Sequence, residues 1–184
     1  MIGLYVLIGI VVIVAFYAIA QYNGFVKLRN LVEEAFSTMD VYLKKRYDLI
    51  PNLVETVKGY AAHESETLEG VIAARNAAGH ASTPEARMQA EGDLSQVMGR
   101  LFALTESYPD LKANTNFMDL QGQLKTIETE IAQSRKYYNG TVRQYNTKRE
   151  SFPSNIIAGM FNFTAKPLYE VTNVEERENV KVQF

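Results

Sequence analysis

The side chains best suited to chemistry in this sequence are its two histidines. His63 lies in the run AAHESE, and His80 lies in a later run that we expect to be a loop. Their separation forms neither an HExxH pair nor any other spacing typical of a metal site. We therefore expect both histidines to be solvated, and we predict no metal ligands.

Carboxylates gather in two further runs, HESETLE and IETE. Glu66 and Glu69 are three residues apart, so they share one face of a helix. A carboxylate site in a helical bundle needs a matching carboxylate or histidine from another helix, and no such motif is present. We expect a solvated helix surface, with a metal-dependent or carboxylate-dependent hydrolase as the alternative. The clustered residues are Glu64, Glu66, Glu69, Glu128 and Glu130.

Other catalytic signatures are missing from the sequence. It has no glycine-rich phosphate loop, since Gly59 and Gly70 are isolated, and no GxSxG elbow. It has no cysteine, hence no thiolate nucleophile, thiolate metal site or disulfide. We predict a protein that is not an enzyme, with no catalytic residues, no cofactor-binding residues and no cofactor.

The charge balance argues against nucleic acid as a partner. Charged residues make up 22% of the chain and the formal net charge is −2. A nucleic-acid surface usually needs a basic excess, because it neutralises phosphates. We therefore predict no nucleic-acid binding.

The N-terminal segment has the composition of a membrane anchor. No charged side chain occurs from Met1 to Val26, and about 20 apolar helical residues cross the hydrocarbon core of a bilayer. A cleavable signal peptide is one alternative, because Ala18-Ile19-Ala20 has the small-x-small form, although the segment lacks a basic start. A buried core helix is the other alternative.

Positive charges follow this segment, beginning with Lys27 and Arg29. The positive-inside rule therefore favours a short N-terminus outside and a C-terminal domain in the cytoplasm.

The rest of the chain has helical periodicity. Apolar residues recur at steps of three and four from Leu28 to Leu43, so we expect the membrane helix to continue unbroken up to Pro51. We expect Pro51 to begin a second helix that ends before Gly79. A third helix is predicted from an N-cap at Ser82 or Thr83, with Glu85 completing a capping box from Ser82, to about Tyr108.

The fourth predicted helix has heptad-like spacing from Phe117 to Tyr145. YPDLKANTN before it is expected to be a polar connection, and SNIIAGMFNF after it a short apolar helix or cap. The predicted fold is all-α: an N-terminal transmembrane helix that continues into an antiparallel bundle of about four long helices. The predicted domains are an anchor at 1–26, a bundle at 27–165 and a flexible charged tail at 166–184.

Aromatic residues mark the bundle and its end. We expect most tyrosines to pack in the core or at its edge, with a partner patch as the alternative. In YNTKRESFPSN we expect Phe152 to cover the end of the bundle, Pro153 to stop the helix, and Ser154 or Asn155 to cap the next one. A docking site is the alternative for this block.

Several of these runs resemble the LemA family of bacterial membrane proteins. The resemblance covers the sequence from Asn23 to Asn76, LFALTESYPDLKAN, and YYNGTVRQYNTKRESFPSNIIAGMF. It implies a short outward N-terminus, one transmembrane helix and a cytoplasmic bundle of long helices. It also implies no established enzymatic activity and a loose link to envelope stress and protein quality control.

Together, these features predict a self-assembling scaffold or adaptor. We expect it in the bacterial cytoplasmic (inner) membrane, crossing the lipid bilayer once and forming a homo-oligomer. A membrane protein of envelope proteolysis or of the stress response is the expected further partner. An exported soluble bundle, with a mature N-terminus near Gln21, is the remaining alternative.

Overall fold

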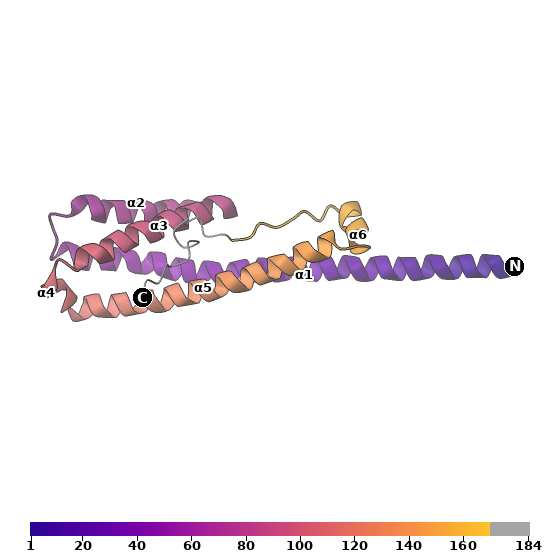
Figure 1. Cartoon of the computed structure of the whole chain (residues 1–184), viewed down its shortest axis with the longest axis horizontal. Coiled ribbons are helices and arrows are strands. Elements are labelled where there is room, and N and C mark those ends of the chain that lie inside the picture. The colour runs from indigo at the N-terminus through magenta and orange to yellow at the C-terminus, as the bar shows by residue number, and fades with distance from the viewer. Residues whose placement is uncertain (170–184) are drawn as a thin grey trace, which may run out of the picture. The chain divides into compact units, whose positions relative to one another are not determined.

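The computed structural model describes residues 1–169, and every regular element in that range is a helix (Figure 1). The predicted all-α fold is thus confirmed. The chain divides into two compact units, to both of which the long helices α1 and α5 contribute. The helices are α1 (Ile2–Lys58), α2 (Ser65–His80), α3 (Pro84–Thr105), α4 (Pro109–Lys112), α5 (Thr115–Glu150) and α6 (Ser154–Met160).

The first unit contains residues 1–38 and 134–168. Here α1 and α5 pack antiparallel, because Phe25 contacts Tyr145 and Phe36 contacts Tyr138, with ring centroids 6.2 and 5.8 Å apart. The helix α6 follows α5 and buries Ile157 on its inner side.

The N-terminal part of α1 is exposed along its whole apolar length. It holds the one stretch among residues 1–169 that is long and apolar enough to cross a membrane, and none of that stretch is buried. A core helix would be covered by other elements, so the alternative of a buried core helix is wrong.

The second unit contains residues 39–133, together with Tyr169. Four helical segments pack here: the end of α1, then α2, α3 and the start of α5. Tyr47 in α1 contacts Arg75 in α2, and Tyr60, just after α1, contacts Asn114, just before α5. The core is apolar and includes Met39, Leu43, Ile50, Leu53, Val71, Leu94, Leu101, Phe117 and Leu124.

The predicted helix start at Pro51 is wrong, because Pro51 lies inside α1, which continues to Lys58. Proline has no backbone N–H, so the carbonyl four residues earlier, on Tyr47, loses its helical partner. The side chain of Arg75 replaces that donor, with its Nε 3.1 Å from the Tyr47 carbonyl oxygen. The helix therefore continues because a residue of α2 satisfies the carbonyl that Pro51 leaves unpaired.

The break comes instead at residues 59–64, within the predicted second helix. Gly59 lies in the turn there rather than inside a helix. At the start of α3, the predicted alternative of Thr83 as N-cap is confirmed, because its Oγ1 accepts from the Ala86 N–H at 3.1 Å. The capping box from Ser82 is therefore wrong, since Glu85 is not three residues after the cap.

The predicted polar connection before α5 contains one short helix, α4. After it, the Oδ1 of Asn114 accepts from the Phe117 N–H at 3.0 Å and so caps α5. The helix α5 then runs unbroken to Glu150, which confirms the heptad-like fourth helix.

The flexible tail predicted for 166–184 lies mostly outside the described residues, which end at Tyr169. Its first residues lie along α5. The Tyr138 hydroxyl donates to the Pro167 carbonyl at 3.0 Å, and Asn146 exchanges two hydrogen bonds with the Lys166 backbone.

Candidate functional site

An arginine lies at the centre of the second unit. Arg46, in α1, has an exposed fraction of 0%. Its position follows from the helical repeat, because Met39, Leu43, Arg46 and Ile50 are separated by steps of four, three and four, and all four are fully buried.

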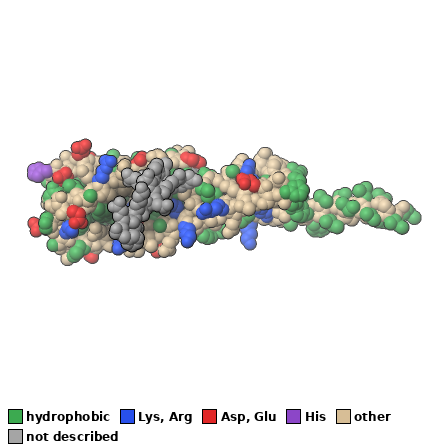
Figure 2. Space-filling model, in the orientation of Figure 1, with side chains coloured by type: hydrophobic (Ala, Val, Ile, Leu, Met, Phe, Trp, Pro, Cys, Tyr) green, Lys and Arg blue, Asp and Glu red, His purple; other side chains and the backbone are tan. Residues whose placement is uncertain are grey.

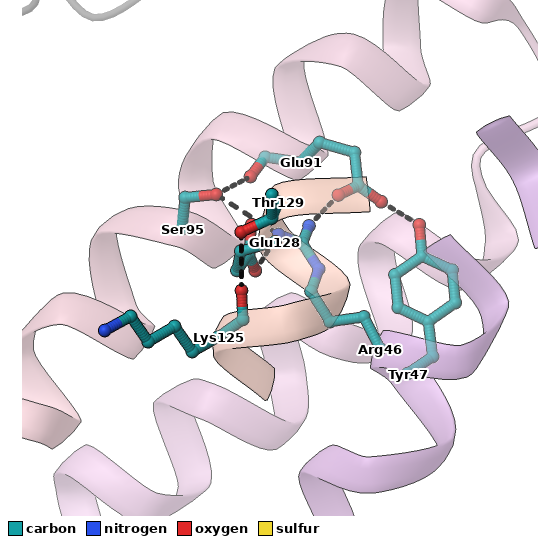
Figure 3. Close-up of polar contacts among 7 residues, drawn as sticks. All are labelled: Arg46, Tyr47, Glu91, Ser95, Lys125, Glu128 and Thr129. Atoms are coloured by element: carbon teal, nitrogen blue, oxygen red, sulfur yellow. Dashed lines mark hydrogen bonds and ion pairs between the residues drawn. The ribbon is translucent and has the colours of Figure 1, made fainter. Parts of the chain in front are cut away.

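Two other helices, α3 and α5, supply partners to this guanidinium (Figure 3). Its Nη2 forms an ion pair with Glu91 of α3, whose exposed fraction is 1%. The hydroxyl of Tyr47 donates to the other oxygen of the same carboxylate. From α5, the Oε1 of Glu128 accepts from Arg46 Nη1 at 2.8 Å, and the exposed fraction of that side chain is 49%.

Burial of these charges is costly unless they are paired, because the low-dielectric interior replaces water poorly. Glu91 meets that requirement, since both of its oxygens accept hydrogen bonds. Arg46 meets it less completely, because its Nε has no hydrogen-bond partner among residues 1–169. The network therefore fixes the register of α1, α3 and α5 relative to one another and adds little to the net free energy of unfolding.

The network is poorly suited to proton transfer. A guanidinium stays charged throughout the pH range of proteins and cannot act as a base. The carboxylate of Glu91 is enclosed by its partners and buried. We therefore interpret Arg46, Tyr47 and Glu91 as a structural lock, meaning a buried polar cluster that fixes the packing of α1 against α3.

The carboxylates singled out in the sequence do not form one site. Glu128 joins Arg46, whereas Glu64 accepts a hydrogen bond from the hydroxyl of Tyr108 at 3.1 Å. This hydrogen bond to a carboxylate raises the pKa of Tyr108 above its ordinary value. No group of three or more His, Asp or Glu residues within 1–169 is placed to hold a metal ion.

The two histidines are exposed, as predicted. Nδ1 of His80 lies 2.7 Å from the Asn76 carbonyl oxygen, one helical turn earlier, whereas His63 lies in the turn before α2. They are not brought together.

A groove of about 560 Å³ runs between the last turns of α1 and the helix α2. Its apolar wall includes Val54, Leu68 and Ile72, and Glu69 is the one member of the predicted Glu64–Glu69 edge that lines it. Lys58 lines the same groove. A second hollow of about 470 Å³ in the same unit is lined by Glu128 together with Met98, Phe102 and Leu124.

Two of the structural roles predicted for the block YNTKRESFPSN are wrong. Phe152 does not cover the end of the bundle within residues 1–169, because the exposed fraction of its side chain is 80%. Ser154 does not cap α6; its hydroxyl donates to the carbonyls of Lys148 and Ser151 at 2.6 and 2.9 Å. The first of these bonds gives a partner to a carbonyl in the last turn of α5, where helical partners run out. The Ser151 carbonyl, just after the helix, also accepts from the Asn155 N–H at 2.8 Å.

The tyrosines mostly lie where the apolar stripes predict. Tyr47, Tyr138 and Tyr145 are buried, whereas Tyr60 and Tyr137 are exposed. Burial raises the pKa of Tyr145 above its ordinary value of 10.0, and the nearby charges of Arg149 and Arg29 oppose this rise.

Sequence reasoning missed the partnership of Arg46 with Glu91. Neither Arg46 nor Glu91 was among the candidate site residues. A signal exists, since Glu91 precedes Leu94, Met98 and Leu101 by steps of three, four and three and so lies on their apolar stripe. Opposite charges on two such stripes indicate a buried pair.

Comparison with known proteins identifies a family and several relatives. The sequence model of the LemA family matches residues 35–184, which begin after the apolar stretch. Magnetosome protein MamQ 2 of Paramagnetospirillum magneticum is 26% identical, over 85% of this chain and 68% of that protein. Protein LemA of Metamycoplasma hominis is 22% identical, over 87% of this chain and 74% of its own length. Magnetosome protein MamQ of Magnetospirillum gryphiswaldense is 23% identical, over 85% of this chain and 68% of that protein.

None of these names describes a catalytic reaction. The family match covers far more than half of the chain, and it agrees with the resemblance carried by the sequence motifs. This chain belongs to the LemA family.

Proposed function

We propose that this chain is a membrane-anchored, non-enzymatic scaffold or adaptor of the bacterial envelope that assembles with copies of itself. The observation that carries the proposal is the continuity of α1. This helix has 57 residues, a length of about 85 Å, and contains both the exposed apolar stretch and residues of the bundle core. A helix transmits position better than a flexible linker.

The ionic network supports a passive role. A bundle whose central charges are paired and enclosed presents surfaces rather than a reacting group, and fixed helix register suits a protein that others recognise by shape. Protein surfaces for assembly are then the expected working parts.

Assembly can be measured on the full chain in its membrane. Photo-crosslinking in cells, followed by mass spectrometry, is expected to recover contacts between copies and contacts with a membrane protein of envelope proteolysis or stress response. The same chain in nanodiscs is expected to have the mass of more than one copy. A strictly monomeric particle that crosslinks to nothing would contradict the proposal.

We place the protein in the cytoplasmic membrane, with a short N-terminus outside and the bundle in the cytoplasm. The exposed Lys27 and Arg29 after the apolar stretch support this orientation. Because the chain has no cysteine, single cysteines report topology cleanly. A membrane-impermeant maleimide should label Ile2→Cys in spheroplasts and should label Ser107→Cys only after permeabilisation; the reverse pattern would invert the orientation.

The groove between α1 and α2 is the one feature that favours a hydrolase instead, because Glu55 and Glu69 both line it. Metal analysis of the purified full chain separates the two functions. The scaffold proposal expects no stoichiometric metal. Stoichiometric metal that is lost in Glu69→Gln but kept in Glu85→Gln would support the enzyme.

Signal cleavage is separated from anchoring by the mature N-terminus. An anchored chain keeps Met1 or begins directly after it. Sequencing that finds Gln21 at the N-terminus would show an exported bundle.

A further inference from the structure

The helix α6 has an apolar face that no part of residues 1–169 covers. Phe152, Ile156, Met160 and Phe161 are each more than half exposed. Ile156 and Met160 are four residues apart and so share one face of this short helix, which Phe152 precedes and Phe161 follows. The opposite side is different, because Ile157 and Ala158 are buried against the unit.

The turn after α6 keeps its exposed apolar face separate from its buried face. The Phe163 N–H donates to the Ala158 carbonyl at 2.9 Å, and Asn162 adopts a φ of 53°. This is a Schellman motif, in which a left-handed residue ends the helix and reverses the chain. The reversal turns Phe163 inward, where it is buried, and leaves Phe161 on the exposed side.

The face lies next to the point where the apolar stretch of α1 ends. Tyr22, two residues after Ala20, contacts Phe161 with ring centroids 4.8 Å apart and Phe163 at 5.7 Å. Phe163 in turn stacks on Phe25 at 4.8 Å. All of these residues belong to the first unit. The unit thus places α6 at the level where the anchor would leave lipid (Figure 1).

The composition of the surface around α6 also suits the boundary between a membrane and water. Green apolar side chains gather at the end of this unit that surrounds the emerging N-terminal helix (Figure 2). Beside Phe161, a groove of about 300 Å³ is lined by Tyr22 and by two cationic residues, Arg29 and Lys166. Aromatic rings and basic side chains next to an apolar face are typical of elements at the membrane interface.

We propose that the exposed face of α6 lies in the boundary between headgroups and acyl chains of the membrane that α1 spans. The proposal rests on α1 being an anchor, as argued above. Continuity with the exposed apolar stretch of α1 favours lipid as the occupant, and the cations of the groove complement lipid phosphates. The bundle then contacts the membrane at two elements instead of one, which limits its tilt about the anchor.

Tryptophan fluorescence tests the depth of α6 directly, because the chain contains no tryptophan. The full chain carrying Met160→Trp is placed in bilayers of phosphatidylcholine and phosphatidylglycerol with lipids brominated near the headgroup or near the chain end. Met160→Trp is expected to emit blue-shifted light and to lose more intensity with bromine near the headgroup. Val12→Trp, in the middle of the apolar stretch, is expected to lose more with bromine near the chain end. Tyr137→Trp, exposed on α5, is expected to emit as in water and to lose little.

The outcomes separate the interfacial position of α6 from the anchoring of α1. If Val12→Trp is quenched while Met160→Trp behaves like Tyr137→Trp, the interfacial proposal is overturned and the anchor stands. If neither is quenched, the anchor itself fails. If the blue shift of Met160→Trp disappears in nanodiscs that hold a single copy, the face contacts a second copy and the proposal is overturned. Ile156→Trp repeats the measurement should Met160→Trp disturb the fold.

Discussion

Arg46 and Glu91 illustrate how a single residue can be decisive without being catalytic. Each lies on an apolar stripe, where a charge is tolerated only with a partner. The pair joins α1 to α3, and the half-exposed Glu128 adds α5. Such pairs typically add little net stability, but removing one member leaves the other as an unpaired buried charge.

Glu91→Gln is therefore expected to lower the free energy of unfolding by about 3 to 5 kcal/mol, because the buried charge of Arg46 loses its enclosed partner. Denaturant unfolding of the full chain in detergent, followed by circular dichroism, measures the loss. Glu128→Gln is the matched control, and its half-exposed side chain predicts a loss of at most about 1 kcal/mol. Equal losses in the two variants would show that the Arg46–Glu91 pair is not the lock.

Tyr145 gives a prediction for pH. Its pKa is raised in the folded state, so the folded chain holds this proton more tightly than the unfolded chain. The contribution of Tyr145 to the free energy of unfolding is fully present below the pKa of 10.0 in the unfolded chain. It is lost as the pH rises through the higher pKa in the folded chain. Thermal unfolding midpoints of Tyr145→Phe should fall less steeply above about pH 10 than those of the parent chain. Tyr137→Phe, at an exposed position, should retain the parental slope.

At the scale of elements, α1 shows that a helix boundary depends on more than its own residues. Pro51 and the turn near Gly59 both interrupt the pattern, yet the helix passes the proline and ends near the glycine. The difference is the donor that Arg75 supplies to the Tyr47 carbonyl.

This compensation predicts a rescue. Arg75→Met is expected to destabilise the full chain by about 1 to 3 kcal/mol, because the Tyr47 carbonyl loses its charged donor. Pro51→Ala returns a backbone N–H to the same carbonyl, so Arg75→Met should cost clearly less in the Pro51→Ala background. A double-mutant cycle of unfolding free energies measures the coupling. Strict additivity would mean that Arg75 acts elsewhere.

At the scale of the whole molecule, the apolar start of α1 is expected to determine where the protein resides. Val11→Lys combined with Val12→Lys introduces two charges at the middle of the stretch, each costing about 2.5 to 3.5 kcal/mol on insertion scales. The parent chain should stay in the membrane pellet after carbonate washing, and the double variant should shift to the supernatant. Val41→Lys, exposed in the bundle, should pellet like the parent. Release of the parent chain itself would refute membrane anchoring.

Much of the architecture was predictable because its causes are local. The uncharged stretch before Lys27 and the heptad-like steps from Phe117 to Tyr145 specify helices through neighbours three and four residues away. The all-α fold, the continuation of the membrane helix and α5 follow from these patterns. The family motifs predicted the same arrangement.

Only the tertiary structure decided the rest, because the deciding partner lies far away in the sequence. Arg75 donates to the carbonyl that Pro51 leaves unpaired, and Glu91 compensates the buried charge of Arg46. The contact of Phe161 with Tyr22 places α6 beside the end of the apolar stretch of α1. Periodicity reports which side of a helix is apolar, but not which side chain from another helix satisfies a stranded carbonyl or charge. Nor does it report that the apolar face of α6 is left exposed by the rest of residues 1–169, since coverage depends on how every neighbouring element packs.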